Sequence, residues 1–294
     1  MKLATFIYNG SEQAGVFVEG QGFYPFSALI GDNAPKTMLE FIQNPAANLE
    51  ELAGLAKAAP IPEADVKLCA PIPRPIRNVF CLGKNYAEHA KEVAAAHNQA
   101  DVDYIPQYPV YFTKSAYPEA PGDKASIPLL GHFTQKVDYE AELAVIIGKK
   151  ASRITEGQVE DVLFGYTVLN DVTAREAQQR YGQWHYGKGL DNFCPMEPHI
   201  ITKDEILFPV ELGIYCRVNG ETRQESNTNM LIYGIPRIIA ELSQGITLYP
   251  GDIIATGTPA GVGHAMSPPS YLAPGDVVEC EVEKVGILTN YFVE

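Results

Sequence analysis

Apolar and polar positions divide the chain into a short first part and a longer second part. The stretch FIYNGSEQAGVFVEGQGFYPF, residues 6–26, alternates short apolar runs with polar turns, which predicts a few short strands. Residues 37–59 then predict helical structure that is interrupted at Asn44-Pro45. The proline-rich stretch 70–80 fits no regular element and predicts a linker. We therefore expect a small α/β N-terminal domain, residues 1–70, followed by a main domain, residues 71–294.

The main part is predicted to contain many strands and a few short helices. Strand-like and helix-like runs alternate irregularly along it, with strands at 76–83 and 163–171 and helices at 85–96, 173–182 and 230–245. Asn219-Gly220 predicts a tight hairpin. Three Pro-Gly-Asp turns, which begin at residues 121, 250 and 274, each precede a strand-like run and suggest a folded-over β-roll. Because strands and helices do not alternate regularly, we expect an α+β fold dominated by a mixed β-sheet with short flanking helices.

Two carboxylates stand directly before the most apolar part of a predicted strand. In KVDYEAELAVIIGK, residues 136–149, Glu140 and Glu142 are two positions apart, so on a strand both point to the same face. Like charges at this spacing repel, and burying them is unfavourable unless an opposite charge compensates. A solvent-facing pair at a strand end is the alternative interpretation.

Asp171 is the third candidate carboxylate, because it closes the strand-like run GYTVLND where that strand meets a predicted helix. Its alternative role is a helix N-cap, and Thr173 with Glu176 forms a capping-box pattern. Three carboxylates without a cysteine or histidine suit a hard divalent cation, Mg²⁺ before Mn²⁺ or Ca²⁺. Such a cation would supply the charge that the two glutamates require.

Three further segments carry candidate chemistry. His89 and Glu92 are three positions apart on the predicted helix 85–96, so Glu92 could fix the tautomer of a His89 general base; a surface polar pair is the alternative. Lys188 between two glycines predicts a close-approach loop that meets an oxyanion or a carboxylate, with a solvated turn as the alternative. GDIIATGTPAGVG, residues 251–263, predicts either a nest of backbone N–H groups for an anion or a tight hairpin.

Composition narrows the class of partner. The 294 residues include 22 Lys plus Arg against 36 Asp plus Glu, a formal net charge of -14, so the chain lacks the basic footprint of nucleic-acid or anionic-membrane binding. Five scattered cysteines without a CxxC pair argue against a disulfide framework or a zinc site. The sequence shows neither a leader pattern nor a run of about 18 apolar residues. We expect a cytoplasmic protein whose partners are small molecules or cations, with no nucleic-acid or membrane partner.

Taken in order, these segments resemble the fumarylacetoacetate hydrolase family. The resemblance rests on six stretches from about residue 77 to residue 294: RNVFCLGKNYAEHAKE, VDYEAELAVIIGK, GYTVLNDVTAREAQ, GKGLDNFCP, VNGETRQESNTNMLIYGIPRIIAELSQ and GDIIATGTPAGVG. It implies the family's β-roll or sandwich of mixed sheets, a homodimer, and a small variable domain in the first 70 residues. It also implies a Mg²⁺ or Mn²⁺ site made by Glu140, Glu142 and Asp171.

The same resemblance implies roles for the other candidates. His89 and Glu92 would form a catalytic dyad on a lid segment that orders over bound substrate, and Lys188 would be a catalytic residue that holds substrate oxygens. Contacts with the substrate are implied for Lys84, Arg175, Gln178 and Thr258.

The implied reaction is hydrolysis of a carbon–carbon bond in an acylpyruvate-type diketo acid, such as fumarylpyruvate or acetylpyruvate. The diketo acid would chelate the metal, a water activated by His89 would attack the acyl carbonyl, and pyruvate would leave as a metal-held enolate. Closing the lid would exclude bulk water. The same chemistry also suits an oxaloacetate-type decarboxylase or a 2-hydroxyhepta-2,4-diene-1,7-dioate-type isomerase. A metal-binding β-module without catalysis is a more distant alternative.

The chain departs from the family pattern at three places. Family members usually have Cys-Pro-x-Gly-Pro where residues 194–198 read CPMEP, so the local turn is expected to differ. Residues 94–109 are longer than in compact members and predict a different lid or pocket wall. His132, near the entry to the strand 136–149, is a candidate pocket residue, with a surface histidine as the alternative.

Overall fold

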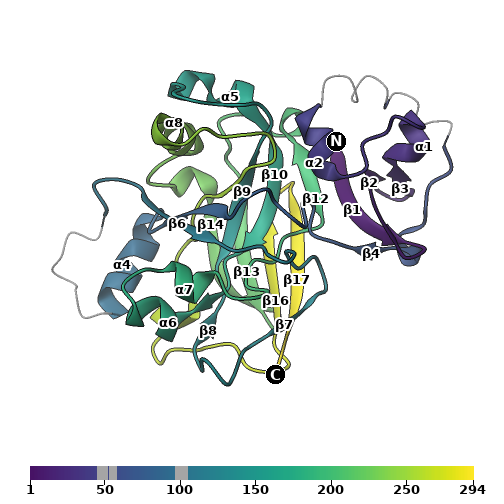
Figure 1. The fold of residues 1–294 in the computed structure, drawn as a ribbon. Helices are drawn as coiled ribbons and strands as arrows, with labels where there is room; N and C mark the ends of the chain where they lie inside the picture. Colours follow the sequence, from purple (N-terminus) through teal and green to yellow (C-terminus); the bar gives the residue numbers. More distant parts are fainter. Residues whose placement is uncertain (45–51, 53–57, 97–104) are drawn as a thin grey trace.

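Two β-sheets packed against each other form the body of the molecule (Figure 1). The structure is a computed structural model that describes residues 1–44, 52, 58–96 and 105–294. The larger sheet has ten strands in the order β3-β2-β1-β12-β10-β9-β15-β5-β6, with β4 paired to β1. The second sheet has five strands in the order β14-β13-β16-β17-β7, and β8 pairs with β11 separately. The α+β fold with mixed sheets is therefore confirmed.

The strands and helices have the following bounds. The larger sheet contains β1 Lys2–Tyr8, β2 Ser11–Val18, β3 Gly22–Pro25, β4 Lys67–Leu68, β5 Val79–Gly83, β6 Val110–Lys114, β9 Ala141–Ile147, β10 Leu163–Asn170, β12 His199–Thr202 and β15 Ile253–Ala255. The other strands are β7 Ser126–Pro128, β8 Val137–Asp138, β11 Thr173–Ala174, β13 Gly213–Val218, β14 Glu221–Asn227, β16 Val277–Val282 and β17 Gly286–Val293. The helices are α1 Phe26–Ile30, α2 Met38–Gln43, α4 Ala87–Ala96, α5 Val159–Val162, α6 Arg175–Arg180, α7 His185–Lys188 and α8 Ile235–Gly245. None of these described helices has the length and apolar character needed to span a lipid bilayer.

Strands β9 and β10 lie at the centre of the fold. Every residue of both strands is buried, because the second sheet covers one face of the larger sheet and other apolar side chains cover the opposite face. Val145 and Val168 belong to the same apolar cluster as Ile214 of the second sheet. A strand that is buried on both faces requires a continuous apolar run, which is what LAVII supplies. The predicted interior strand is confirmed.

The antiparallel register of β9 and β10 determines where the candidate carboxylates meet. Leu169 pairs with Glu142 and Asn170 pairs with Ala141. The backbone N–H of Asp171 then donates to the carbonyl of Glu140 at 2.8 Å. The end of β10 therefore lies beside the start of β9, where the two glutamates stand.

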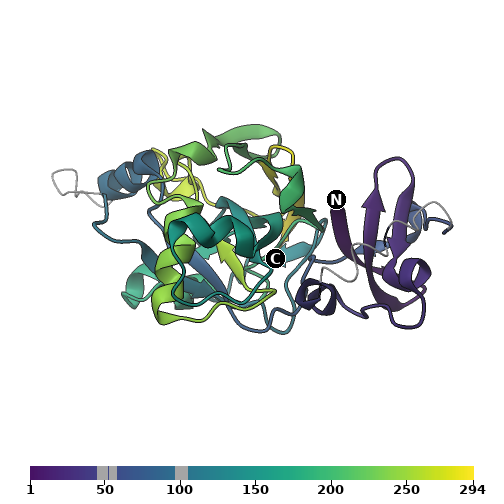
Figure 2. The same ribbon diagram turned by 90° about the horizontal axis from the view of Figure 1, so that it is seen from above.

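The N-terminal strands continue the main sheet. β1 pairs antiparallel with β12, with Lys2 opposite Ile201. Figure 2 shows this part as a lobe at one side of the molecule, and it contains a small apolar cluster of its own around Phe6 and Phe23. The domain boundary at residue 70 stays a prediction. Helix α2 ends at Gln43, before the predicted break at Asn44-Pro45, and most of the predicted helical continuation lies outside the described residues.

Several local predictions are confirmed, and one boundary is corrected. The predicted helices 85–96, 173–182 and 230–245 correspond to α4, α6 and α8. Asn219 and Gly220 join β13 to β14 with φ values of 54° and 79°, as a two-residue hairpin requires. The predicted linker 70–80 is shorter than expected, because Val79 and Phe80 already pair with β6 as part of β5.

Candidate active site

Three buried carboxylates meet at the start of β9. Ligand oxygens of Glu140, Glu142 and Asp171 all lie within 4.8 Å of one another. Glu140 directly precedes β9, Glu142 is its second residue, and Asp171 follows β10. The three residues are 4%, 1% and 0% exposed, so the alternative of a solvent-facing glutamate pair is wrong.

Asp171 does not cap a helix, and the predicted capping box is wrong. Thr173 donates its hydroxyl to the carbonyl of Asp171 at 2.8 Å. Helix α6 begins at Arg175 after Ala174, which makes no side-chain cap. Glu176 accepts instead from the Thr134 hydroxyl at 2.7 Å. The physical reason is that residues 173–174 pair with β8 as strand β11, so the helix begins later than the local pattern indicates.

Two lysines bind the carboxylate cluster. Lys188 Nζ lies 2.7 Å from Glu140 Oε2 and 2.7 Å from Asp171 Oδ2. Lys114 Nζ lies 2.6 Å from Asp171 Oδ1, donates to the carbonyl of Val172 at 3.0 Å and contacts the carbonyl of Lys188. Both lysines are buried. The solvated-turn alternative for Lys188 is therefore wrong, and sequence reasoning missed Lys114, because a lysine that ends a strand usually reaches solvent.

Arg175 forms a second group of ion pairs with the cluster. Its Nε and Nη2 atoms each lie 2.8 Å from Asp138 Oδ2, and Nη2 also lies 2.8 Å from Glu140 Oε1. Asp138 accepts in addition from the backbone N–H groups of Gly263 and His264, each at 2.9 Å. Arg175 therefore orients a candidate metal ligand as well as lining the cavity described below. Sequence reasoning missed Asp138, which no local signal distinguishes from a surface aspartate.

The charges of this region leave one negative charge in excess. The buried carboxylates are Asp138, Glu140, Glu142 and Asp171, and the buried cations paired with them are Lys114, Arg175 and Lys188. Four negative charges against three positive charges give a net charge of minus one. A buried excess charge is unfavourable unless it is neutralised. This group of buried side chains therefore lacks a compensating positive charge.

The excess negative charge is least compensated at Glu142. Its Oε2 accepts from the backbone N–H of Gly257 at 2.8 Å, whereas its buried Oε1 has no hydrogen-bond partner among the described residues. Burial, together with Asp171 and Glu140, raises the pKa of Glu142 well above its usual range. Burial acts in the same direction on Glu140, but Lys188 and Arg175 outweigh it and lower that pKa to about 2. A divalent cation that prefers oxygen ligands would give Oε1 a partner and more than offset the excess negative charge, so these residues fit the implied metal.

The predicted dyad is present on α4. His89 Nδ1 lies 2.8 Å from Glu92 Oε1, and His89 is 5% exposed. Both oxygens of Glu92 accept from the backbone N–H of Gly261, at 3.1 and 2.9 Å. Because a carboxylate only accepts, Nδ1 donates and the neutral ring has its lone pair on Nε2. The alternative of a surface polar pair is therefore wrong.

The loop 256–264 binds the protein's own carboxylates. Its backbone N–H groups at residues 257, 261, 263 and 264 donate to Glu142, Glu92 and Asp138. Of the two interpretations of the segment 251–263, the nest of N–H groups is confirmed and the tight hairpin is wrong, because β15 lies between β9 and β5 in the sheet. This loop joins the dyad to the carboxylate cluster.

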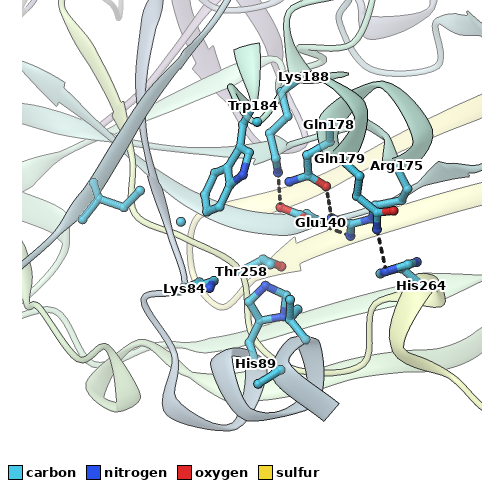
Figure 3. Close-up of a pocket in the computed structure, with 15 residues that line it drawn as sticks. Lys84, His89, Glu140, Arg175, Gln178, Gln179, Trp184, Lys188, Thr258 and His264 are labelled. Atoms are coloured by element: carbon cyan, nitrogen blue, oxygen red, sulfur yellow. Dashed lines mark hydrogen bonds and ion pairs between the residues drawn. The ribbon is translucent and has the colours of Figure 1, made fainter. Parts of the chain in front are cut away.

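A cavity of about 250 Å³ brings most of the predicted residues together (Figure 3). It is lined by seven of the ten predicted site residues, Lys84, His89, Glu140, Arg175, Gln178, Lys188 and Thr258. Glu92, Glu142 and Asp171 lie behind this lining. Sequence reasoning missed the other eight lining residues, among them Gln179, Trp184 and His264. His132 is exposed and does not line the cavity, which confirms its surface alternative.

The remaining candidates occupy defined positions at the cavity. Thr258 accepts from Gln224 Nε2 at 2.8 Å, and Gln178 accepts from Arg175 Nη1 at 3.2 Å. Lys84 has a positive φ of 54°. Lys188 ends helix α7, where a Cβ added to the preceding Gly187 would lie 2.4 Å from the backbone nitrogen of Gln178. The close approach predicted from the flanking glycines is therefore confirmed, but the predicted loop is wrong, because Lys188 is the last residue of a helix.

Glu197, which stands where family members usually have glycine, is buried and hydrogen-bonded. Glu197 is 2% exposed and accepts from the backbone N–H and from Nδ1 of His199, at 2.8 and 2.7 Å. Its own backbone N–H donates to the carbonyl of Val168 at 2.9 Å. Part of the longer segment 94–109, residues 97–104, lies outside the described residues.

Replacing Lys114 with methionine is expected to destabilise the fold by about 3–5 kcal/mol, because it leaves buried Asp171 without one of its two cations. Urea unfolding with a metal chelator present measures this effect. Lys91, whose side chain is 61% exposed, is the matched control, and the same replacement there is expected to cost less than about 1 kcal/mol. Equal unfolding free energies for the two variants would contradict the assignment of Lys114.

Comparisons with known proteins find relatives of one family. The family model described as fumarylacetoacetate (FAA) hydrolase C-terminal matches residues 78–293. Oxaloacetate tautomerase YisK of Bacillus subtilis (strain 168) is 44% identical over 227 residues, which are 77% of this chain and 73% of that protein. The solved fumarylacetoacetate hydrolase from psychrophilic Exiguobacterium antarcticum has a TM-score of 0.85 at 38% identity, over 100% of this chain and 99% of that chain. Maleylpyruvate hydrolase from Sphingobium sp. SYK-6, solved in complex with manganese (II) ion and pyruvate, has a TM-score of 0.78 at 32% identity, over 100% and 99%.

Proposed function

The chain belongs to the fumarylacetoacetate hydrolase family, and we propose that it hydrolyses a carbon–carbon bond in acylpyruvate-type diketo acids with a divalent cation. The observation that carries this proposal is that His89, whose Nδ1 is held by Glu92, lines the same cavity as Glu140 and Lys188 (Figure 3). A Mg²⁺ or Mn²⁺ ion held by Glu140, Glu142 and Asp171 would supply Lewis-acid polarisation of the substrate oxygens. The unpartnered Glu142 Oε1 supports this ion, as does the manganese-bound Sphingobium relative.

His89 and Glu92 would activate the attacking water. Glu92 holds Nδ1–H, so Nε2 takes a proton from water, and the resulting hydroxide attacks the acyl carbonyl carbon. The bond from that carbon to the neighbouring methylene carbon then breaks, and its electron pair forms the enolate of pyruvate. Return of the proton to the methylene carbon gives pyruvate, and the acyl group leaves as a carboxylic acid.

Lys188 would stabilise the negative charge that develops during these steps. An ammonium group has three N–H donors, and two of those of Lys188 are directed to Glu140 and Asp171. The third would donate to a substrate oxygen at the cavity. Donors that are fixed before the reaction stabilise a developing oxyanion most strongly.

Keto–enol tautomerisation of oxaloacetate is the second candidate, favoured by the 44% identity to oxaloacetate tautomerase YisK. It needs the same dyad but no attack by water. His89 would take a proton from C3 of the keto form, and the oxygen at C2 would gain one, so that only a proton changes position.

A substrate panel separates these activities. Acetylpyruvate, fumarylpyruvate and oxaloacetate are each incubated with Mg²⁺ or Mn²⁺, with and without a chelator. We expect pyruvate from the acylpyruvates, abolished by the chelator. Absence of pyruvate together with faster enol–keto conversion of oxaloacetate would replace the proposal with the second candidate. Release of CO₂ from oxaloacetate above the metal-only rate would instead indicate a decarboxylase.

A further inference from the structure

Trp184 forms one wall of the cavity and has no role in the chemistry described above. It is the single tryptophan of the chain and directly precedes α7, whose last residue is Lys188. Figure 3 shows its ring beside Lys188, extending toward Lys84 and Thr258. The ring therefore lies where a ligand held by Lys188 would continue into the cavity.

Contacts on two sides keep this ring in place. A Cβ added to Gly83, the last residue of β5, would lie 2.0 Å from Trp184 Cζ3 and 2.8 Å from Cη2, so the ring already packs on the β5 backbone. The ring of Phe112 lies 5.6 Å away, centroid to centroid, at an interplanar angle of 69°. The Trp184 carbonyl also accepts from the backbone N–H groups of Gly187 and Lys188, at 2.9 and 3.1 Å. The ring cannot move back toward β5 to enlarge the cavity.

The cavity lining is unevenly polar. Arg175, Gln178, Gln179 and His264 lie together on one side in Figure 3, and Trp184 lies apart from them. Trp184 packs on Gly83, and the neighbouring Leu82 also lines the cavity. The charged and keto groups of a diketo acid would be held by the charged residues, Lys188 included, and an apolar acyl group would contact the Trp184 ring and Leu82.

We propose that Trp184 sets the upper size limit of the acyl group, and that the substrates of this enzyme are diketo acids with short, unbranched acyl groups. The inference rests on the proposed function and deepens it. A wall that is fixed on two sides excludes a bulky acyl group by direct steric overlap, whereas a small acyl group leaves the wall in place.

Two substitutions change the wall in opposite directions. Trp184→Ala removes it and enlarges the cavity. Gly83→Ala adds a methyl group that pushes the Trp184 ring away from β5, and the Gly83 backbone does not have the positive φ that would itself resist a side chain. Since the overlapping atoms are at the end of the indole ring, Gly83→Ala is expected to move the ring without unfolding the sheet.

The test compares kcat/KM for acetylpyruvate and for the bulkier pivaloylpyruvate. Trp184→Ala is expected to raise the ratio of kcat/KM for pivaloylpyruvate to kcat/KM for acetylpyruvate at least about 10-fold, because a few methyl groups in an apolar pocket have an effect of this size. Gly83→Ala is expected to lower the same ratio. Trp184→Phe, which keeps a smaller ring, should fall between wild type and alanine. Tyr181→Ala, at a 53% exposed aromatic residue outside the cavity lining, is the matched control and should leave the ratio unchanged. A ratio that Trp184→Ala does not change, or changes no more than Tyr181→Ala does, overturns the inference.

A binding measurement separates this inference from the proposed function. Calorimetry with Mg²⁺ compares pyruvate with the bulkier 3,3-dimethyl-2-oxobutanoate, which requires no turnover. If acylpyruvates are not hydrolysed but Trp184→Ala binds the bulkier acid more tightly relative to pyruvate, the proposed function fails and the size limit stands. If acylpyruvates are hydrolysed and neither ratio changes in Trp184→Ala, the size limit alone fails.

Discussion

Replacement of Glu142 with glutamine is expected to lower kcat/KM at least about 100-fold while leaving the fold intact, because it removes a charge that the catalytic cation requires. Glutamine has the same shape as glutamate, and its amide oxygen can still accept from the Gly257 N–H that now binds Oε2. Burial, Asp171 and Glu140 raise the pKa of Glu142, so its negative charge is unfavourable in the metal-free protein. The variant should therefore unfold at no lower urea concentration than wild type in the presence of a chelator.

Steady-state kinetics and thermal unfolding with added Mn²⁺ measure these effects. Mn²⁺ should stabilise wild type and have little effect on Glu142→Gln, since a ligand stabilises only the state that binds it. Glu197→Gln is the matched control, because Glu197 is also a buried glutamate whose pKa is raised by burial but it does not belong to the cluster of three carboxylates. A Glu142→Gln enzyme that keeps the activity and the Mn²⁺ response of this control would contradict the role of Glu142.

Replacement of His89 with glutamine is expected to lower kcat about 10²–10⁴-fold, the usual contribution of a general base. The loss should appear in kcat with little change in Mn²⁺ affinity, since His89 is paired with Glu92 and is not among the three clustered carboxylates. Rapid-quench measurement of pyruvate formation, together with Mn²⁺ titration, separates the two effects.

His132→Gln is the control for this second prediction, since His132 is exposed and lies outside the cavity lining. It should retain the wild-type rate. If His89→Gln hydrolyses acylpyruvates as fast as the control does, the dyad is not the base, and a different group must activate the water.

The local parts of the candidate site are those that the sequence predicts well. The period of two at the start of β9 places Glu142 and the preceding Glu140 on one face, and the spacing of three along α4 places Glu92 beside His89. Both relations depend only on the geometry of one element. Both elements were recognisable from their apolar pattern, so the structure retains these pairs as expected.

The contacts of the candidate site that depend on pairing between distant segments could not be predicted from local sequence patterns. Lys114 reaches Asp171 across 57 positions because β6 ends at the cluster, and nothing near Lys114 in the sequence indicates that it is buried. The bond from Gly261 to Glu92 spans 169 positions. The capping box predicted at Thr173 is wrong for the same reason, because pairing of β11 with β8 overrode the local preference for a helix start. Trp184 was missed because its contact with Gly83 joins two segments that are far apart in the sequence.

The central claim is that Glu140, Glu142 and Asp171 hold a divalent cation at the cavity that His89 faces. Anomalous diffraction from crystals grown with Mn²⁺ tests it most directly. We predict one strong anomalous peak per chain, with an oxygen of each of these three carboxylates about 2.1 Å away. A Mn²⁺ peak only at another place in the protein, or no peak at all, would contradict this claim.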